Sequence, residues 1–503
     1  MNKIKNIFWV AVAAFALLLT PSCDTENGVN EEQAKPEISL ALSEVALTIP
    51  AEGGVMSVDV ITNAESWEAI SAVSWAEVSK VDDTITIVAT ENTSNTSRQG
   101  DILVIATTGT TTAEKSISLE QAAAGGTTAG GELTFECPVF ESLVLTSYDS
   151  NGDGALSTEE AAVVTDLILS LDESSEAEQE AITSLKGIKN FVNLVHLECD
   201  GNLLTSLDLS GLEKLEYVDC CYNNITTLNV NGCKSLKWLY CYMNKIDKFY
   251  HEGCDNIMFI MAYQNRLKSI DVSGMAELVY LDLRINALRE AKFNNCPKLQ
   301  IVAVGSNNLI SLDLSGVPAL SSLGCYDNSI ASLDLSGLPK LDFLECYTNN
   351  ISTLDLSANK ALTYVACQNN LISELKIDNC TSLHKVDCSN NRLAGSFDAS
   401  KFKLLTSLCC GGNSLTEVKV SACTALTELQ CQNTSITTLD VSTLTKLETL
   451  VANDCRLTTM DCSNNRALST LYLQGNPLTS LVLAKGQSIA DIKLDNFDVI
   501  SYK

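Results

Sequence analysis

The feature that most constrains this chain is a 21-residue repeat that occupies residues 191–503. An asparagine marks the same point of successive copies, at Asn202, Asn223, Asn244, Asn265, Asn286, Asn307, Asn328, Asn349, Asn370 and Asn391. One extra residue moves the next copy to Asn413, and the period then continues through Thr434, Cys455, Asn476 and Phe497. Repetition at this period predicts a solenoid of about 15 coils, in which each coil packs against the next one.

Apolar residues within each copy predict two extended stretches. In the clearest copy Leu344 and Cys346 are two residues apart, and so are Leu354 and Leu356. This spacing places both members of a pair on one face of a strand. Asn349 and its equivalents are expected to turn the chain and to hydrogen-bond neighbouring backbones. Because other residues replace this asparagine near the carboxy terminus, we expect that end of the solenoid to be looser.

Many of the cysteines follow the same repeat. Nine of the 20 occupy one strand position, at Cys199, Cys220, Cys241, Cys325, Cys346, Cys367, Cys388, Cys410 and Cys431. Other copies hold alanine, valine or leucine there, so the position belongs to the apolar core. Neighbouring strands lie about 4.8 Å apart, farther than the Cβ separation of about 3.8 Å in a disulfide. We therefore expect a ladder of buried free thiols, with metal binding as the weaker alternative because Cys-x-x-Cys pairs are missing. Cys221 and Cys409, which adjoin ladder positions, are expected to be exposed.

These repeats resemble a known family. The length of 21 residues, the cysteine in the core strand and the trailing Leu-Asp-Leu-Ser of residues 354–357 are similar to the cysteine-ladder leucine-rich repeats of internalin J-like surface proteins. The resemblance covers residues 191–503 and implies a curved solenoid with a parallel sheet on its concave side. It also implies an adhesive, non-catalytic role.

Outward-facing residues of the concave sheet predict a binding face. Residues that alternate with the core positions of each strand point into solvent, and beyond Tyr364 they become small and polar. A contiguous exposed apolar patch marks a binding site, and tyrosine and tryptophan are favoured interface anchors. The alternative is that aromatic residues merely suit strands and stack on one another. Eleven aromatic residues form this face: Tyr217, Trp238, Tyr240, Tyr242, Phe259, Tyr263, Tyr280, Tyr326, Phe343, Tyr347 and Tyr364. The charged residues expected to hydrogen-bond around it are Glu198, Asp200, Asp219, Asp282, Arg284 and Glu345.

The amino-terminal residues have the pattern of an exported lipoprotein. Lys3 and Lys5 precede an apolar run at 7–19 that is too short for a membrane-spanning helix. The run ends in Leu-Thr-Pro-Ser-Cys at 19–23, which resembles the lipobox of bacterial lipoproteins. The resemblance implies a signal peptide over 1–22, lipidation of Cys23, a tether over 23–36 and an outer-membrane location at the cell surface, as in the Bacteroidetes. Ordinary cleavage that leaves a free cysteine is the alternative.

Residues 37–121 are expected to form a β-sandwich. Short β-branched runs are separated by clusters of Gly, Asn, Asp and Ser, which predicts about seven strands and an immunoglobulin-like fold. Trp67, Trp75 and the Arg98-x-Gly100-Asp101 stretch are similar to the BACON domain of Bacteroidetes surface proteins. That family carries a carbohydrate-binding proposal, but the two tryptophans are expected at the core or its rim, so a spacer role is the simpler reading. Residues 122–131, rich in Ala, Gly and Thr, predict a linker.

Residues 132–190 contain a calcium-loop pattern. The spacing D-x-[DN]-x-[DN]-G-x5-E predicts oxygen ligands for Ca²⁺, and the flanking segments 139–148 and 158–169 can be helical. The loop resembles an EF-hand or dockerin-type half-site, and we expect a structural calcium ion in a helical cap of the solenoid. An acidic turn that binds no ion is the alternative, and acidic residues 172–180 are expected to form a solvent-exposed insertion. The predicted ligands are Asp149, Asn151, Asp153, Ala155, Ser157 and Glu160.

The net charge and the motifs limit the classes of function that the sequence allows. The formal net charge of −29 disfavours binding to nucleic acid. The three histidines, His196, His251 and His384, are scattered and suggest no Ser-His-Asp or Cys-His grouping, so we expect no enzyme. The sequence therefore predicts a multidomain, mainly β, cell-surface binding protein, adhesin-like, that captures a protein or glycan. A glycan-capture component of a nutrient-uptake system and a structural spacer are the alternatives.

Overall fold

The computed structural model describes residues 38–51, 53–94, 97–109, 111–122, 133–171 and 180–503. The chain divides into two compact units, 1–129 and 130–503, which are described separately. The predicted signal peptide, Cys23 and the tether lie outside the described residues, as do nearly all of the linker and the acidic insertion. Within the described ranges no helix is long and apolar enough to cross a membrane.

The first unit consists of two four-stranded sheets around one core. Adjacent strands pair antiparallel, except that β2 runs parallel to β8. Alternate residues such as Val58 and Ile85 in one sheet, and Ile102 and Ile117 in the other, are fully buried, as period-two alternation predicts. One sheet holds β1 (Leu40–Leu42), β3 (Gly54–Thr62), β6 (Thr84–Ala89) and β5 (Ala76–Val81). The other holds β2 (Ala46–Ile49), β8 (Thr111–Gln121), β7 (Arg98–Thr108) and β4 (Ser66–Ser71).

The two tryptophans of this unit belong to its core and rim. Trp67 is buried, and the Lys80 ammonium lies 4.0 Å from the centroid of its ring. Trp75 packs against the edge of the same core, with the Arg98 guanidinium 4.6 Å from its ring centroid. Neither ring forms a flat exposed platform. This agrees with the prediction that both tryptophans lie in the core or at its rim. The finer assignment to an immunoglobulin-like topology stays a prediction.

The second unit begins with a small helical segment that packs against the first coils of the solenoid. Helix α2 (Pro138–Tyr148) starts with proline at its first turn, and α3 (Thr158–Ala162) starts with a capping box at Ser157. Buried Phe140 contacts the ring of Phe191 at 6.3 Å between centroids, so helix and solenoid share one core. Strand β9 (Asp166–Ile168) pairs with the next strand of the solenoid. The solenoid sheet therefore begins within the segment predicted as the cap, ahead of the 3-10 helix η2 (Ile188–Asn190).

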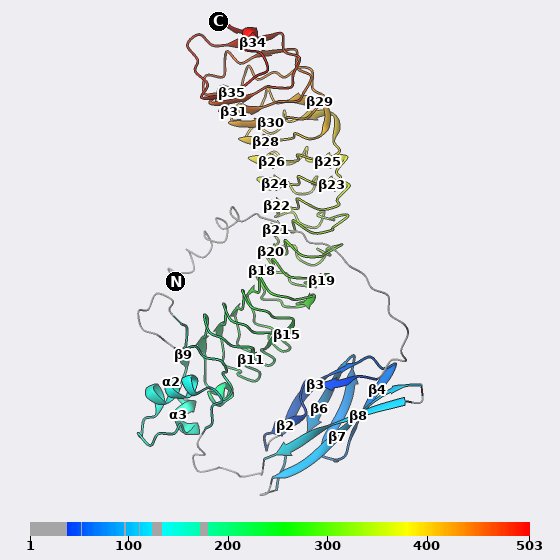
Figure 1. The fold of residues 1–503 in the computed structure, drawn as a ribbon, viewed down its shortest axis with the longest axis vertical. Helices are drawn as coiled ribbons and strands as arrows, with labels where there is room; N and C mark the ends of the chain where they lie inside the picture. Colours follow the sequence, from blue (N-terminus) through cyan, green and yellow to red (C-terminus); the bar gives the residue numbers. More distant parts are fainter. Residues whose placement is uncertain (1–37, 52, 95–96, 110, 123–132, 172–179) are drawn as a thin grey trace. The chain divides into compact units, whose positions relative to one another are not determined.

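One parallel sheet of 16 strands runs the length of the solenoid. Figure 1 shows that the solenoid bows with this sheet on the inner side, and we call it the concave sheet. Its strands pair in the register of the repeat, as Tyr217 with Trp238 shows. After β9 they are β10 (His196–Glu198), β12 (Tyr217–Asp219), β14 (Trp238–Tyr240), β16 (Phe259–Met261), β18 (Tyr280–Asp282), β20 (Ile301–Ala303), β21 (Ser322–Gly324), β22 (Phe343–Glu345), β24 (Tyr364–Ala366), β26 (Lys385–Asp387), β28 (Ser407–Cys409), β30 (Glu428–Gln430), β31 (Thr449–Val451), β33 (Thr470–Tyr472) and β35 (Asp491–Lys493).

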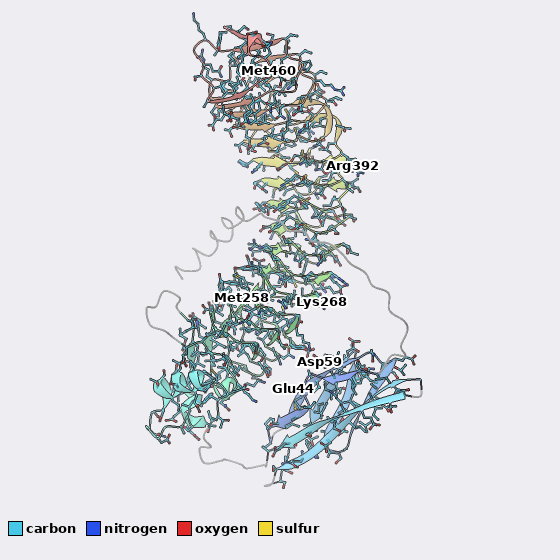
Figure 2. All side chains as sticks on the ribbon, in the orientation of Figure 1. Glu44, Asp59, Met258, Lys268, Arg392 and Met460 are labelled. Carbon is cyan, nitrogen blue, oxygen red and sulfur yellow. The ribbon has the colours of Figure 1, made fainter. Side chains whose placement is uncertain are left out.

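A second strand in most coils lies on the opposite side, as the paired apolar positions predicted. Figure 2 shows Met258, just before β16, and Lys268, just before β17, on opposite sides of one coil. These outer strands form five short parallel sheets, and 3-10 helix η3 (Phe497–Val499) precedes the last strand. They are β11 (Ser206–Asp208), β13 (Thr227–Asn229), β15 (Lys248–Tyr250), β17 (Ser269–Asp271), β19 (Glu290–Lys292), β23 (Thr353–Asp355), β25 (Glu374–Lys376), β27 (Ala394–Asp398), β29 (Ser414–Lys419), β32 (Thr459–Asp461), β34 (Ser480–Leu483) and β36 (Ile500–Tyr502).

The extra residue between Asn391 and Asn413 affects the outer side of the solenoid. Strands β27 and β29 pair with a register shift between Gly395 and Ser396. On the concave side β26 and β28 remain in unbroken register. A bulge in the outer strands therefore absorbs the irregularity.

The predicted asparagine ladder is present. Asn349 donates from Nδ2 to the carbonyl oxygens of Cys325 at 3.0 Å and Cys346 at 3.1 Å, and its Oδ1 accepts from the Ile330 amide at 2.9 Å. Each such asparagine therefore ties its own coil to the preceding one. At position 434 a threonine hydroxyl takes over the bond to the Cys431 carbonyl at 2.8 Å. The ladder is thus weakened near the carboxy terminus but continues through this substitution.

All described cysteines are buried free thiols, which confirms the predicted ladder. Burial in the apolar core raises the pKa of ladder thiols such as Cys199 well above the ordinary value. A second cysteine column, which the sequence analysis missed, donates S–H to a carbonyl of the preceding coil, as Cys254 does to Val230 at 2.9 Å. The intervals between its members are multiples of the 21-residue repeat, apart from the one extra residue that precedes Cys423, and this spacing was the available signal. The members of this second column are Cys233, Cys254, Cys296, Cys380 and Cys423.

Candidate ligand-binding face

Three columns of side chains point outward from the concave sheet. They are the first and third residues of each strand and the residue after the ladder cysteine. Ten of the eleven predicted aromatic residues are half-buried in these columns, and we call the eleven together the aromatic face. Tyr280 departs from the prediction because it is only 7% exposed. It packs beside Phe259, with ring centroids 6.2 Å apart, and is part of the foundation of the face.

Aromatic residues in neighbouring coils stack in parallel pairs. Ring centroids are 4.5 Å apart for Tyr242 and Tyr263, with an interplanar angle of 7°. Two further pairs have nearly the same geometry: Tyr326 with Tyr347 at 4.7 Å and 7°, and Phe343 with Tyr364 at 4.4 Å and 8°. The separations are close to the strand spacing of about 4.8 Å, so the ring faces point along the solenoid axis. The ring edges are therefore turned away from the neighbouring coils, and the Tyr364 side chain hydrogen-bonds to Glu345.

The amino-terminal end of the face includes two residues outside the predicted set of eleven. His196 stacks on Tyr217 at 4.3 Å between centroids, and its Nε2 lies 2.9 Å from Glu198 Oε1. Tyr222 is 52% exposed and packs edge-on against Tyr242 at 5.4 Å. The sequence analysis missed Tyr222 because it lies in the turn after the strand, at a φ of 52°. Its place directly before a ladder asparagine was the available signal.

An ion pair divides the aromatic face. Arg284 donates from Nε to Asp282 Oδ1 at 2.9 Å and from Nη2 to Oδ2 at 2.6 Å. Asp282 is 1% exposed, so the expectation that it offers hydrogen bonds to a ligand is wrong. Its carboxylate is fully engaged by the long arginine side chain of the same coil. The Arg284 guanidinium also lies 5.6 Å from the centroid of the Tyr263 ring.

Small residues follow the ion pair along the columns. A Cβ atom added to Gly305 would lie 2.5 Å from the Tyr326 ring, so glycine is required for that ring to lie across it. Ala303 and Gly324 occupy the middle column of the next two strands and are buried. The aromatic face therefore consists of an amino-terminal group and a second group formed by Tyr326, Phe343, Tyr347 and Tyr364.

Cys221 and Cys409 are buried, contrary to the sequence prediction. Cys221 is 1% exposed, although its column faces outward. Burial, together with the nearby Asp219 carboxylate, raises the pKa of the Cys221 thiol far above its ordinary value. Cys409 is buried in the same way, and its pKa is raised to about 12. Large neighbouring side chains close over small cysteines on a crowded sheet, so neither thiol offers a reactive thiolate.

The calcium-loop residues are brought together, but their oxygens contact the loop itself. Asp149 accepts from the Gly152 and Gly154 amides at 2.7 and 2.9 Å. Asn151 Oδ1 accepts from the Asp153 amide at 2.8 Å, and Asp153 Oδ1 accepts from the Ala155 amide at 3.0 Å.

Glu160 closes the loop by binding protein groups. Its Oε1 accepts from the Ser150 amide at 2.8 Å, and its Oε2 accepts from the Ser157 amide at 3.0 Å and hydroxyl at 2.8 Å. These bonds lower the pKa of Glu160 to about 2. Within the described ranges, no three His, Cys, Asp or Glu side chains converge in a way that could hold a metal ion. This conformation is therefore not a formed calcium shell, because Glu160 would have to exchange its partners first.

The two units are similar to two different classes of known protein. Residues 65–122 match the BACON family, described as "Putative binding domain, N-terminal". The second unit has the fold of leucine-rich-repeat proteins with a cysteine ladder. The description of the first class indicates a binding role. Comparison with curated protein sequences gives no match.

Among solved structures, the chain is similar to the functional domain of InlJ from Listeria monocytogenes, which includes a cysteine ladder. The two are 29% identical, the match covers 68% of this chain and 71% of that one, and the TM-score is 0.51. The ectodomain of the Arabidopsis thaliana receptor kinase GASSHO1/SCHENGEN3, in complex with CASPARIAN STRIP INTEGRITY FACTOR 2, is 20% identical over 69% of this chain and 46% of that chain, with a TM-score of 0.52. YopM of Yersinia pestis is 21% identical over 60% and 83%, with a TM-score of 0.50. The last two show the fold alone.

Proposed function

We propose that this protein is a non-catalytic, adhesin-like surface protein that captures a protein ligand on the aromatic face of its concave sheet. Lipidation at Cys23 and an outer-membrane, surface-exposed location complete the proposal and rest on the sequence pattern alone. The observation that carries the proposal is the stacking of half-buried aromatic pairs over a continuous sheet. Such a surface provides rigid apolar area with polar edges, which is the composition of interface anchors.

The orientation of the rings favours a protein ligand over a glycan. Stacking on a sugar requires a ring face that is open to solvent. In the three parallel pairs, one face of each ring is covered by its partner and the edges point outward. Tyrosine edges and hydroxyls suit the mixed apolar and polar contacts of a protein surface.

The test is binding of the full chain to arrays of proteins and of glycans. The double variant Trp238→Ala/Tyr240→Ala is expected to lose at least about 100-fold in affinity for the ligand found, because two aromatic anchors contribute about 2 kcal/mol or more each. Thr449→Ala/Val451→Ala is the matched control, since these half-buried residues occupy the same two columns of a later coil. Affinity is measured by surface plasmon resonance.

Two outcomes would contradict this proposal. If the ligand is a glycan and free oligosaccharide blocks it, the glycan-capture alternative holds. Equal binding by Trp238→Ala/Tyr240→Ala and the wild type would mean that the amino-terminal group of the aromatic face serves packing and does not bind the ligand.

We also propose that loop 149–160 takes up a structural calcium ion when Glu160 turns toward Asp149, Asn151 and Asp153. Saturating Ca²⁺ is expected to raise the melting temperature of the full chain by several degrees, equivalent to about 2.7 kcal/mol at a hundredfold excess over Kd. Glu160→Gln is the diagnostic variant, because glutamine can keep the capping box but removes a charged ligand. In EDTA it should melt somewhat below the wild type, because glutamine cannot accept at both positions where the Glu160 oxygens accept hydrogen bonds. Ca²⁺ should shift the melting temperature of Glu160→Gln much less than that of the wild type. A wild-type melting temperature that does not change when Ca²⁺ is added would show that the loop binds no structural calcium ion.

A further inference from the structure

Glu345 is a buried acceptor beneath the aromatic face that lacks a full set of partners. It is 6% exposed, and its Oε2 atom has no hydrogen-bond partner. The Tyr364 side chain hydrogen-bonds to the carboxylate. A buried carboxylate oxygen without a donor costs free energy. Such an atom beneath a binding face can gain a donor from a ligand once the neighbouring side chains move aside.

The surroundings of Glu345 are aromatic on both sides. Phe343 and Tyr364 form a stacked pair in the column on one side, and Tyr326 and Tyr347 form a stacked pair in the column on the other. Within its own column the neighbours are the small residues Gly324 and Ala366, which pair with Glu345 in the sheet. A carboxylate between aromatic rings is the arrangement that recognises a guanidinium or ammonium group.

The protein contains a filled version of the same arrangement. Asp282 lies in the same column three repeats, or 63 residues, earlier. Arg284 neutralises that buried carboxylate with two hydrogen bonds and approaches the Tyr263 ring. The position in the coil of Glu345 that corresponds to Arg284 holds Tyr347. Glu345 therefore has the same setting as Asp282 without an arginine from its own coil.

We propose that Glu345 binds an arginine side chain of the protein ligand, which lies between the two stacked aromatic pairs. This inference rests on the proposed function. The ligand guanidinium donates to Oε2 and reproduces the pairing of Arg284 with Asp282. The formal net charge of −29 favours a ligand with a basic surface. The four aromatic residues are half-exposed, so side-chain rotation is enough to admit the arginine.

The ionisation of Glu345 makes this binding depend on pH. Burial raises the pKa of Glu345 to about 7, against the opposing effects of Arg284, the Tyr364 hydrogen bond and Lys385. The carboxyl is therefore partly neutral at pH 7, and an arriving cation favours the ionised form. Affinity should rise from pH 6 to pH 8, and binding at pH 7 should release about half a proton. The titratable groups that face it are Arg284, Cys325, Tyr326, Cys346, Tyr347, Tyr364 and Lys385.

The experiment uses the full chain and the peptide acetyl-Gly-Arg-Gly-amide as the probe, with isothermal titration calorimetry at pH 6, 7 and 8. The wild type is expected to bind about tenfold more weakly at pH 6 than at pH 8. Glu345→Gln should bind about tenfold more weakly than the wild type at pH 8 and show no pH dependence. A peptide with neutral citrulline in place of arginine should not bind.

Controls separate this site from general attraction to an acidic protein. Glu374→Gln removes one charge from an exposed outer-strand residue and should bind the arginine peptide like the wild type. Equal binding by Glu345→Gln and the wild type, or equal binding of the citrulline peptide, would overturn the proposal. If Trp238→Ala/Tyr240→Ala loses the array ligand while Glu345→Gln keeps it, the proposed function stands and this inference fails.

Discussion

Replacing Asn349 with alanine is expected to lower the free energy of unfolding by about 3 to 5 kcal/mol. The change leaves the Ile330 amide without its acceptor 2.9 Å away. It also removes the hydrogen bonds that Asn349 donates to the Cys325 and Cys346 carbonyls, each worth about 1 kcal/mol, although these carbonyls keep Asn328 and Asn370 as donors. Each buried unpaired backbone group costs about 1 to 3 kcal/mol. The variant also loses the cross-link between two neighbouring coils, so the effect exceeds that of an ordinary deleted side chain.

The adjacent Asn350 gives a matched control. Its side chain is exposed and makes one long hydrogen bond of 3.5 Å to the Ser329 carbonyl. Asn350→Ala should change stability by less than about 0.5 kcal/mol. Urea unfolding followed by circular dichroism compares the variants, and hydrogen exchange at the Ile330 amide detects local opening. A loss below about 1 kcal/mol for Asn349→Ala would mean that backbone contacts alone hold the coils together.

Replacing Phe140 with alanine is expected to destabilise the amino-terminal coils by about 3 to 5 kcal/mol, the range for buried phenylalanine. The Phe140 ring packs edge-on against Phe135 at 5.2 Å and contacts Phe191 at 6.3 Å between centroids. Since an unprotected end exposes the apolar core of a solenoid, melting should start at β9 and β10. Hydrogen exchange should therefore accelerate there before it accelerates in the central coils.

Leu143 provides the comparison for Phe140. It lies on the same helix but is exposed, so Leu143→Ala should leave exchange at β9 and β10 unchanged. Uniform exchange across the solenoid in Phe140→Ala would show that α2 does not act as a cap.

The solenoid could be predicted from the sequence because its determinants repeat. Leu344 and Cys346 face the core for the same reason in every coil, and the asparagine that follows bonds to backbone atoms that are always in the same place. Each repeat thus provides an independent observation of one local structure. The second cysteine column follows the same spacing and was missed because some of its positions hold other residues, such as Asn359.

The details of the candidate site were less predictable because they depend on side chains of unequal length in neighbouring coils. Alternation places Asp282 outward, but it does not show that Arg284 reaches back to cover it. Crowding by large residues likewise buries Tyr280 and Cys221, which share outward columns with exposed residues. Glu160 belongs to two overlapping motifs, the calcium loop and the capping box, and only the structure shows which hydrogen bonds form.

The bulge between Gly395 and Ser396 shows which changes in sequence length the solenoid can accept without altering its inner surface. Because the outer strands absorb an added residue while the concave strands keep their register, single insertions leave the inner surface unchanged. The inner surface can then lengthen or shorten only by whole coils, in steps of about 4.8 Å. A duplication or deletion of one repeat would move the Glu345 position relative to the amino-terminal aromatic group by one such step. The contact points on the concave sheet are therefore separated by whole multiples of the strand spacing, and a ligand must match these separations.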